Sequence, residues 1–339
     1  MAEIDSGREP LRGLTRMGAR LLGHWKILLA CSALGTLILA VDPLRLLRAL
    51  ERLRPLSLGE LMLAVLAFYF FKAMGWRSAL VALGIPASRR RTVLATFGAQ
   101  TASLLPLGSL SRVVLLGDSR EIDYGAVTAS IAFQELLLLI LMALASIPGM
   151  IRFPQAGVIA GAMLLATMAA FATLLWRPLY DRAVDLVGKV PYLGRFEGEI
   201  RNLPIGFRRL LQLKVAIRLV AWNAISLACA FGLFFVALRA IGVTQVTFAR
   251  SALVFSVSYM LGALSLLPGG LGAYEATMTG FLVLMGIAAP LGAAAALVYR
   301  GFNDGFMALV GLASLRFLNQ SPQHTGPGPD AREGDIAIP

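Results

Sequence analysis

The amino-acid sequence predicts an all-α polytopic membrane protein built from two inverted repeats, each a helix, a Pro-Gly-broken re-entrant hairpin and a helix, with additional helices. Three observations lead to this fold class. The 339 residues are 58% hydrophobic and only 15% charged, with a mean hydropathy of +0.75, which is typical of polytopic membrane proteins. Two similar Pro-Gly breaks interrupt apolar stretches, and the segments before the breaks match as well.

Six apolar segments each approach the roughly 20 residues that cross about 30 Å of hydrocarbon. They are residues 21–41, 58–83, 127–147, 156–176, 214–238 and 290–316. With the two broken regions they form one predicted membrane domain, residues 21–316, with repeat one at about 58–147 and repeat two at about 214–316. Around them we expect a cytoplasmic N-terminal segment (1–20), a basic cytoplasmic connector (177–213) and a disordered tail rich in Pro, Gly, Ser and charge (317–339).

The two breaks share one phrase. Residues 103–108 read Ser-Leu-Leu-Pro-Leu-Gly, and 162 residues later 265–270 read Ser-Leu-Leu-Pro-Gly-Gly. In the first region the helical stretches 92–105 and 107–117 are too short to cross the bilayer, which favours a re-entrant hairpin. In the second, 251–267 and 269–286 are longer, so two full crossings stand as an alternative to the hairpin.

A second match precedes each break. Residues 79–85 read Ala-Leu-Val-Ala-Leu-Gly-Ile, and residues 237–243 read Ala-Leu-Arg-Ala-Ile-Gly-Val. Each phrase closes the helix before its break, at a nearly equal distance from it. Two matches in the same order indicate an internal repeat more strongly than either match alone.

The net charge of +12 would suggest nucleic acid as a partner of a soluble protein, but here the basic residues lie in loops, as the positive-inside rule predicts. The arginines at 89–91 and the segment 177–218, with nine basic and four acidic residues, are expected to be cytoplasmic. The first hairpin then enters from the cytoplasm and the second from the opposite side, with both termini cytoplasmic. Residues 42–56, with four arginines, are at odds with this orientation.

The backbone of the breaks supplies the first site candidates. Proline removes an amide donor and breaks the helix, and glycine lets the chain turn and approach a ligand closely. The helix after the second break would begin at mid-membrane, where its free N–H groups could receive a lipid phosphate. The alternative is that the glycines only permit close helix packing. The candidates are Pro106, Gly108, Pro268, Gly269, Gly270 and Gly272.

Four charged residues in apolar segments are the other candidates: Arg112, Glu135, Glu275 and Arg300. Each costs roughly 2.5 to 3.5 kcal/mol in the membrane unless it is paired or hydrated. The order of signs is swapped between the halves, so a pseudo-two-fold axis would bring Arg112 to Glu275 and Glu135 to Arg300. Three alternatives remain open for such pairs: they bind a substrate, they couple proton movement to transport, or they only stabilise the fold. Asp304, one turn beyond Arg300, offers a local alternative partner.

Residues 266–276, Leu-Leu-Pro-Gly-Gly-Leu-Gly-Ala-Tyr-Glu-Ala, followed by Tyr299-Arg300, resemble the lysylphosphatidylglycerol synthase transmembrane region, a flippase-like membrane domain family. Weaker agreement covers roughly 20–316, at Gly75-Trp76-Arg77, Ala82-Leu83-Gly84, Pro106 and Gln134-Glu135. The resemblance implies a helical membrane domain that moves or handles lipids, sometimes fused to an aminoacyl-transferase domain, which is not among these residues. After Pro106 this chain lacks the Gly-rich turn and further basic residue of many relatives.

No pattern for catalysis or metal binding is evident. Cys31 and Cys229 lie in apolar segments, and His24 and His324 in polar flanks, which allows neither a disulfide framework nor a multi-histidine metal centre. The Pro-Gly-Gly segment lacks the Gly-Lys-Ser/Thr ending of a phosphate-binding loop, and there is no Gly-x-Ser-x-Gly elbow. We therefore expect no enzyme activity, no cofactor and no metal, and transport that is secondary or passive.

The sequence thus predicts a multi-pass inner-membrane protein that binds a polar lipid between inverted halves and translocates it between leaflets. The lipid would be an anionic phospholipid, a glycolipid or an isoprenoid lipid, and the mechanism alternating access around the broken helices. One alternative is a non-transporting accessory protein that scaffolds enzymes of a lipid or hopanoid pathway. Another is an ion-coupled small-solute transporter. The expected partners are membrane lipids and, in the accessory role, lipid-biosynthesis enzymes, with no nucleic acid.

Overall fold

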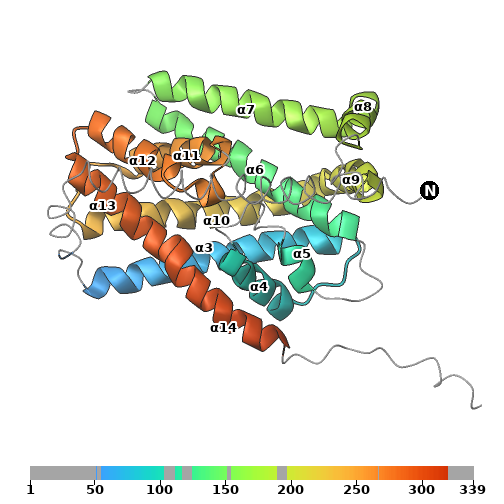
Figure 1. Ribbon diagram of the computed structural model, residues 1–339, viewed down its shortest axis with the longest axis horizontal. Coiled ribbons are helices and arrows are strands. Elements are labelled where there is room, and N and C mark those ends of the chain that lie inside the picture. The colour runs from blue at the N-terminus through green and yellow to red at the C-terminus, as the bar shows by residue number, and fades with distance from the viewer. Residues whose placement is uncertain are drawn as a thin grey trace, which may run out of the picture.

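The computed structural model describes residues 51, 55–102, 111–116, 124–150, 154–188, 197–265 and 267–319, which form helices and short turns (Figure 1). The first half contains α3 (Pro55–Ala82), α4 (Arg89–Gly98), the 3-10 helix η1 (Ala99–Ala102), α5 (Ser111–Leu116) and α6 (Tyr124–Met150). The connecting part contains α7 (Pro154–Leu175), α8 (Arg177–Gly188) and α9 (Glu197–Leu210). The second half contains α10 (Leu213–Ala240), α11 (Phe248–Leu264), the 3-10 helix η4 (Pro268–Gly270), α12 (Ala273–Leu284), α13 (Ala289–Arg300), the π-helix η5 (Gly301–Phe306) and α14 (Met307–Asn319).

The predicted all-α polytopic membrane fold is confirmed. In the described part of the chain, α3, α6, α7 and α10 are long and apolar enough to cross a membrane, and each lies within a few residues of its predicted range. Large apolar side chains point outward, among them Leu63 and Leu165 at 70% and 72% exposure, which is favourable against lipid rather than water. The predicted helix 21–41 and segment 1–20 lie outside the described residues, and α14 runs to Asn319, three residues into the predicted tail.

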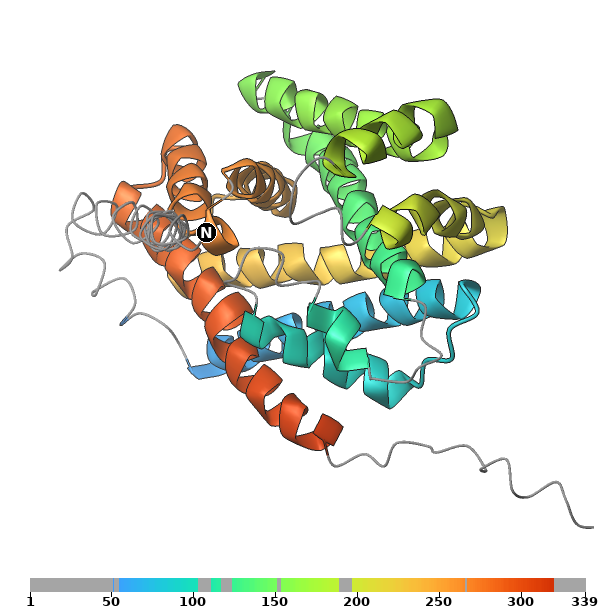
Figure 2. The ribbon, with the colours of Figure 1, turned by 45° about the vertical axis from the view of Figure 1, so that its right-hand side comes forward.

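Helices α3 and α10 form the central pair of the molecule (Figures 1 and 2). The Ser226 hydroxyl on α10 donates to the Phe68 carbonyl on α3 at 3.0 Å, and Trp222 stacks on Phe71 with 6.0 Å between ring centroids. Since the residue numbers fall along one helix as they rise along the other, the pair is antiparallel. An inverted repeat requires this orientation of its two first helices.

Both central helices end in the same motif. Gly84 and Gly242 adopt φ angles of +84° and +90°, a left-handed conformation that glycine adopts without steric cost. The next amide then reaches back into the helix, with Ile85 N donating to Leu80 O and Val243 N to Leu238 O, both at 2.9 Å. This is the Schellman arrangement, which satisfies carbonyls at a helix end, and it explains the second matching phrase of the sequence.

The broken regions follow these helix ends and consist of short helices. In the first, α4 has 10 residues, about 15 Å, and α5 has six, about 9 Å. Neither crosses 30 Å, as a re-entrant hairpin requires; Pro106 and Gly108 lie outside the described residues. In the second, α11 has 17 residues and α12 only 12, about 18 Å, which favours the hairpin over two full crossings.

The two broken regions pack reciprocally on opposite sides of the central pair (Figures 1 and 2). Helix α4 contacts α14 of the other half, and α11 contacts α6. Each contact passes over a glycine: a Cβ at Gly311 would lie 2.6 Å from Phe97 O, and one at Gly149 would lie 2.6 Å from Leu253 Cβ. Small residues of this kind let membrane helices approach closely. The exchange fits a two-fold relation, while the inverted symmetry of whole halves stays a prediction.

The structure adds two features to the predicted organisation. The single helix expected at 290–316 is divided by the π-helix η5, a conformation that is rare and found mostly near functional sites. The segment predicted as a basic connector contains helices α8 and α9, and Phe207 of α9 is buried against Phe133 of α6 and Phe171 of α7, at 5.3 and 5.7 Å between ring centroids.

Candidate functional site

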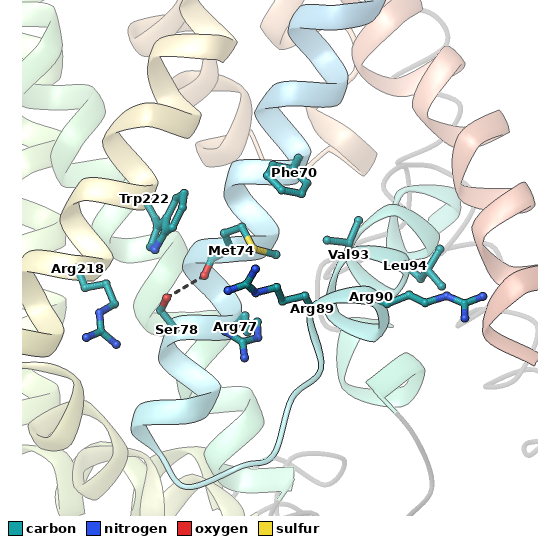
Figure 3. A pocket seen from close by; sticks show the side chains of 10 residues that line it. All are labelled: Phe70, Met74, Arg77, Ser78, Arg89, Arg90, Val93, Leu94, Arg218 and Trp222. Atoms are coloured by element: carbon teal, nitrogen blue, oxygen red, sulfur yellow. Dashed lines mark hydrogen bonds between the residues drawn. The ribbon is translucent and has the colours of Figure 1, made fainter. Parts of the chain in front are cut away.

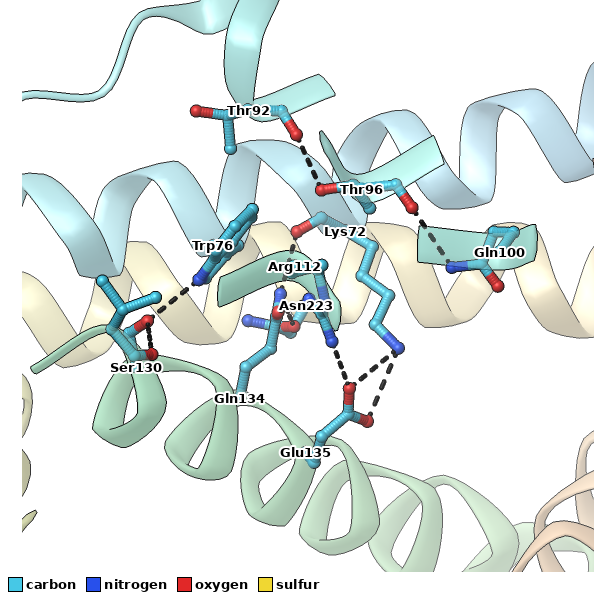
Figure 4. Close-up of polar contacts among 11 residues, drawn as sticks. Lys72, Trp76, Thr92, Thr96, Gln100, Arg112, Ser130, Gln134, Glu135 and Asn223 are labelled. Atoms are coloured by element: carbon cyan, nitrogen blue, oxygen red, sulfur yellow. Dashed lines mark hydrogen bonds and ion pairs between the residues drawn. The ribbon is translucent and has the colours of Figure 1, made fainter. Parts of the chain in front are cut away.

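A cluster of Lys72, Arg112 and Glu135, here called the first charge cluster, joins α3, α5 and α6 (Figure 4). Arg112 Nη2 lies 2.6 Å and Lys72 Nζ 3.2 Å from Glu135 Oε1. The Arg112 side chain is only 2% exposed, whereas Glu135 is 28% exposed. Among the described residues, one carboxylate therefore pairs with two cations in this cluster.

Uncharged groups hold the first charge cluster in place. Arg112 donates to Gln134 Oε1 at 3.0 Å, and its guanidinium lies 5.3 Å from the Trp76 ring centroid, within the range of a cation–π contact. Gln134 donates to Lys72 O at 2.8 Å and to Asn223 Oδ1 at 3.1 Å, so α3, α6 and α10 are cross-linked at this level. A Cβ at Gly75 would lie 3.1 Å from both amide nitrogens of Gln134 and Asn223, so only glycine fits without displacing them.

The second charge cluster, Glu275, Arg300 and Asp304, is built on the second Pro-Gly break. Arg300 Nε lies 2.9 Å from both Glu275 Oε1 and Asp304 Oδ2, and Arg300 Nη1 donates to Gly269 O at 2.9 Å. The guanidinium thereby ties α13 to the broken backbone. In the part of the chain that the structure describes, two carboxylates pair with one cation here, so the carboxylates outnumber the cation.

The glycines of the second break have separate tasks. Gly269, Gly270 and Gly272 have φ angles of +57°, +66° and +82°, which residues with a Cβ adopt at a cost. A Cβ on Gly270 would lie 3.3 Å from backbone atoms of Gly262 in α11, so the close-packing interpretation holds at this position. Pro268 opens η4, ahead of α12.

The start of α12 differs from the prediction. The helix begins at Ala273, and Gly272 N donates to Glu275 Oε2 at 2.7 Å. The protein's own carboxylate thus caps this helix, as acidic residues near the positive end of a helix do. The predicted use of these N–H groups for a lipid phosphate is correspondingly weakened, because one donor is already taken and a negative charge lies beside it.

The predicted exchange of partners between the halves is wrong. Arg112 pairs with Glu135 and Arg300 with Glu275, each within its own half. The α5 and α6 helices follow one another along the chain and contact each other, so the counter-charge of Arg112 is supplied locally. The local partner Asp304 of Arg300 is confirmed.

Sequence reasoning did not include Lys72 in the site. A lysine in the middle of the 28-residue apolar helix α3 carries the same insertion cost that singled out the other charges, and that signal was available. Tyr69 and Asn303 were also missed, and they connect the clusters. Tyr69 Oη lies 3.2 Å from Asn303 Oδ1, and Asn303 Nδ2 donates to Asp304 Oδ1 at 2.7 Å.

The two charge clusters are therefore neighbours. Tyr69 precedes Lys72 by about one turn on the same face of α3, and its hydroxyl is hydrogen-bonded to Asn303, which in turn donates to Asp304. Several polar atoms near the second break have no hydrogen-bond partner among the described residues: Ser256 Oγ, Ser258 Oγ, Thr279 Oγ1 and Arg300 Nη2. Buried polar groups require partners, so this region suits water or a polar ligand.

Comparison with known proteins shows to which family this chain belongs. A search of curated proteins returned no significant match. The model of the lysylphosphatidylglycerol synthase transmembrane region matches residues 24–311, which include both charge clusters and both breaks. This covers most of the 339 residues and agrees with the four long apolar helices. The chain is therefore a multi-pass membrane protein that belongs to the family of the lysylphosphatidylglycerol synthase transmembrane region.

Proposed function

We propose that this protein binds the polar head group of a phosphate-bearing lipid at the two charge clusters and translocates the lipid between leaflets. The observation that carries the proposal is a pair of adjoining clusters that, among the described residues, have opposite ratios of charge: two cations on one carboxylate and two carboxylates on one cation. Structural pairing alone would be served by equal numbers, because an uncompensated charge in a membrane is costly. Unequal numbers of cations and carboxylates are expected where the charge of a bound ligand neutralises the cluster.

The proposed role of each residue follows from the sign of the excess charge in its cluster. Lys72, with Arg112 behind it, would attract the phosphate, because their cluster has an excess positive charge. Asp304 would hold a proton or the cationic part of a head group, because its cluster has an excess negative charge. Tyr69 and Asn303 lie between them and offer hydrogen bonds to the remaining polar atoms. The chain's part is binding and movement, without a chemical step.

Lipid translocation would depend on the two Pro-Gly breaks. Arg300 is bonded to the Gly269 carbonyl and to Glu275, so a ligand that draws Arg300 or Asp304 away also releases the turn between α11 and α12. The π-helix η5 contains Asn303 and Asp304 and lies at this junction, and π-helical turns inside α-helices are frequent at functional sites. Alternating access would then consist of rearrangement of the two hairpins about the α3–α10 pair.

Reconstitution tests the proposal. Purified protein is placed in liposomes with a trace of fluorescent phosphatidylglycerol, phosphatidylcholine or a sugar-phosphate isoprenoid lipid, and dithionite bleaches the probe in the outer leaflet. We expect at least one phosphate-bearing lipid to cross several times faster than in protein-free liposomes from the same preparation. Equal rates for every lipid, in protein shown to be folded, would refute translocation.

An accessory role is the second candidate, favoured by α8 and α9, which place exposed Arg182 and Arg209 beside the membrane domain. In that case lipid translocation is absent, and lipid-biosynthesis enzymes co-purify with the chain. Their recovery would fall on replacement of Arg182 and Arg209 by Gln and would be unchanged by Lys72→Gln. The transport proposal predicts the opposite dependence for lipid movement.

A further inference from the structure

A pocket of about 620 Å³ lies between α3, α4 and α10, on the face of α3 opposite the first charge cluster (Figure 3). Phe70, Met74 and Arg77 follow one another at helical spacing on that face, whereas Tyr69, Lys72 and Trp76 occupy the other. The pocket is thus separate from the clusters proposed for translocation. Its lining is Phe70, Met74, Arg77, Ser78, Arg89, Arg90, Val93, Leu94, Arg218 and Trp222.

Basic side chains from three helices meet at this pocket. Arg77 comes from α3, Arg89 from α4 and Arg218 from α10, and Figure 3 shows Arg89 reaching toward α3 beside Arg77. Within the described part of the chain, no carboxylate belongs to the lining and none of these three arginines forms an ion pair. The positive-inside rule explains basic residues in loops but not their convergence from three helices on one cavity.

The first turn of α4 adds positive potential. Its helix opens with Arg89, Arg90 and Arg91 after the N-cap Ser88, although basic residues are unfavourable at the positive end of a helix dipole. Ser88 Oγ accepts only the Arg91 amide, at 3.2 Å. An anion in the pocket would offset this unfavourable arrangement, since helix N-termini and arginines both bind phosphate.

The lining changes from charged to apolar with depth. Arg77 lies five residues before the end of α3 at Ala82, and Phe70 lies seven residues earlier, about 10 Å deeper along the helix. On the antiparallel α10, Trp222 lies four residues, about 6 Å, deeper than Arg218. The gradient fits an amphiphile with a charged head at the interface and a chain toward the bilayer centre, whereas free phosphate would leave the apolar part unused.

We propose that this pocket is a binding site for an anionic phospholipid, with the phosphate held by Arg77, Arg89 and Arg218 and an acyl chain lying against Phe70 and Trp222. This site is additional to the translocation site and does not depend on transport. A bound lipid would link α4 of the first hairpin to the α3–α10 pair. The site would therefore make the position of that hairpin sensitive to anionic lipid in the same leaflet.

The fluorescence of Trp222, which lines the pocket, reports on lipid bound there. The full chain is placed in phosphatidylcholine nanodiscs, and tryptophan fluorescence is followed as dibrominated phosphatidylglycerol or dibrominated phosphatidylcholine replaces part of the lipid. The Trp222→Phe variant identifies the share of quenching that arises in the pocket. We expect this share to saturate at a lower mole fraction of the glycerol lipid than of the choline lipid.

The variant Arg89→Gln/Arg218→Gln removes two exposed charges that make no described structural contact, and Arg182→Gln/Arg209→Gln is the charge-matched control on α8 and α9. A basic group near an anionic lipid contributes a factor of about five in affinity, so the first variant should shift half-saturation by roughly tenfold or more and the control should not shift it. Unchanged half-saturation in the first variant, or no preference for the glycerol lipid, would overturn the proposal. Displacement by millimolar inorganic phosphate alone would assign the pocket to a soluble anion instead.

Discussion

In each described charge cluster at membrane depth, the numbers of cations and carboxylates are unequal. In the first charge cluster, removing Lys72 leaves the balanced pair Arg112–Glu135, whereas removing Glu135 leaves two cations. Lys72 Nζ and Glu135 Oε1 lie 3.2 Å apart, so the two side chains share one environment. The difference between their variants therefore reports charge balance more than lost packing.

We expect Glu135→Gln to lower the thermal midpoint of the purified protein far more than Lys72→Gln. Breaking a buried ion pair by removing one partner costs about 3 to 5 kcal/mol because a charge is left uncompensated, and Lys72→Gln avoids that state. Differential scanning fluorimetry in one detergent measures both variants. Equal midpoints would show that Lys72 is as necessary to the fold as Glu135.

At the second break we expect Gly270→Ala to destabilise the protein by about 1 to 2 kcal/mol, because alanine is strained at the left-handed φ of +66°. Its Cβ would also lie 3.3 Å from the Gly262 backbone. Gly280→Ala on α12 is the matched control, since a Cβ there has no neighbour within 4 Å. Thermal midpoints compare the two, and a smaller loss for Gly270→Ala than for Gly280→Ala would contradict the packing described.

Of the site residues, the sequence predicted those that break helices or carry charge after a break. Lys72 escaped because hydropathy averaged over a long apolar helix conceals one charge. The partners were predicted wrongly because symmetry between halves was weighed above proximity along the chain, and chain neighbours such as α5 and α6 pack first. Tyr69 and Asn303 carry no charge, so only the three-dimensional structure reveals that they join the clusters.

At the scale of elements, hydropathy predicted the long helices and proline the breaks, because both depend on local composition. The π-helix η5 was not predictable, since no residue pattern distinguishes Gly301–Phe306 from an α-helical continuation. The reciprocal contacts of α4 with α14 and of α11 with α6 depend on which helices meet. One glycine on each of α6 and α14 marks these contacts, but glycine is common in the chain, with 34 residues.

These glycines give a prediction about the hairpin contacts. We expect Gly149→Ala and Gly311→Ala each to destabilise the protein by about 1 to 3 kcal/mol, because the new Cβ would overpack a contact of 2.6 Å. Gly161→Ala on α7 is the control, with no neighbour within 4 Å. Thermal midpoints in detergent provide the comparison. If only one of the pair behaves differently from the control, the contacts are not equivalent.

At the scale of the whole molecule, the antiparallel central pair and the exchanged hairpin contacts are compatible with an inverted repeat, which stays a prediction. Pro86 follows α3 and Gln245 follows α10, in equivalent exposed turns after Gly84 and Gly242. An inverted repeat predicts that these turns lie on opposite sides of the membrane. The positive-inside rule predicts that the turn before Arg89 is the cytoplasmic one.

Cysteine labelling tests this topology. In a chain with Cys31 and Cys229 replaced by Ser, we expect Gln245→Cys to react with an impermeant maleimide added to the outside of intact cells. Pro86→Cys should react only after the cells are opened. Labelling of both positions from the same side would exclude an inverted repeat, whatever its orientation.

If the extra cation of the first charge cluster and the extra carboxylate of the second act on a lipid, Lys72→Gln and Asp304→Asn should each slow lipid translocation. Each leaves a balanced pair behind, Arg112–Glu135 or Arg300–Glu275, so the fold should survive. Arg250→Gln, in the first turn of α11 and outside both charge clusters, is the charge-removing control. The measurement is the initial rate at which a phosphate-bearing lipid crosses reconstituted liposomes at matched protein content.

We predict that both variants lower this rate by about tenfold, the effect of losing roughly 1.4 kcal/mol of interaction, with wild-type thermal midpoints and with Arg250→Gln unaffected. Wild-type rates in both variants would contradict the account, because the uneven charges would then have no part in moving the lipid.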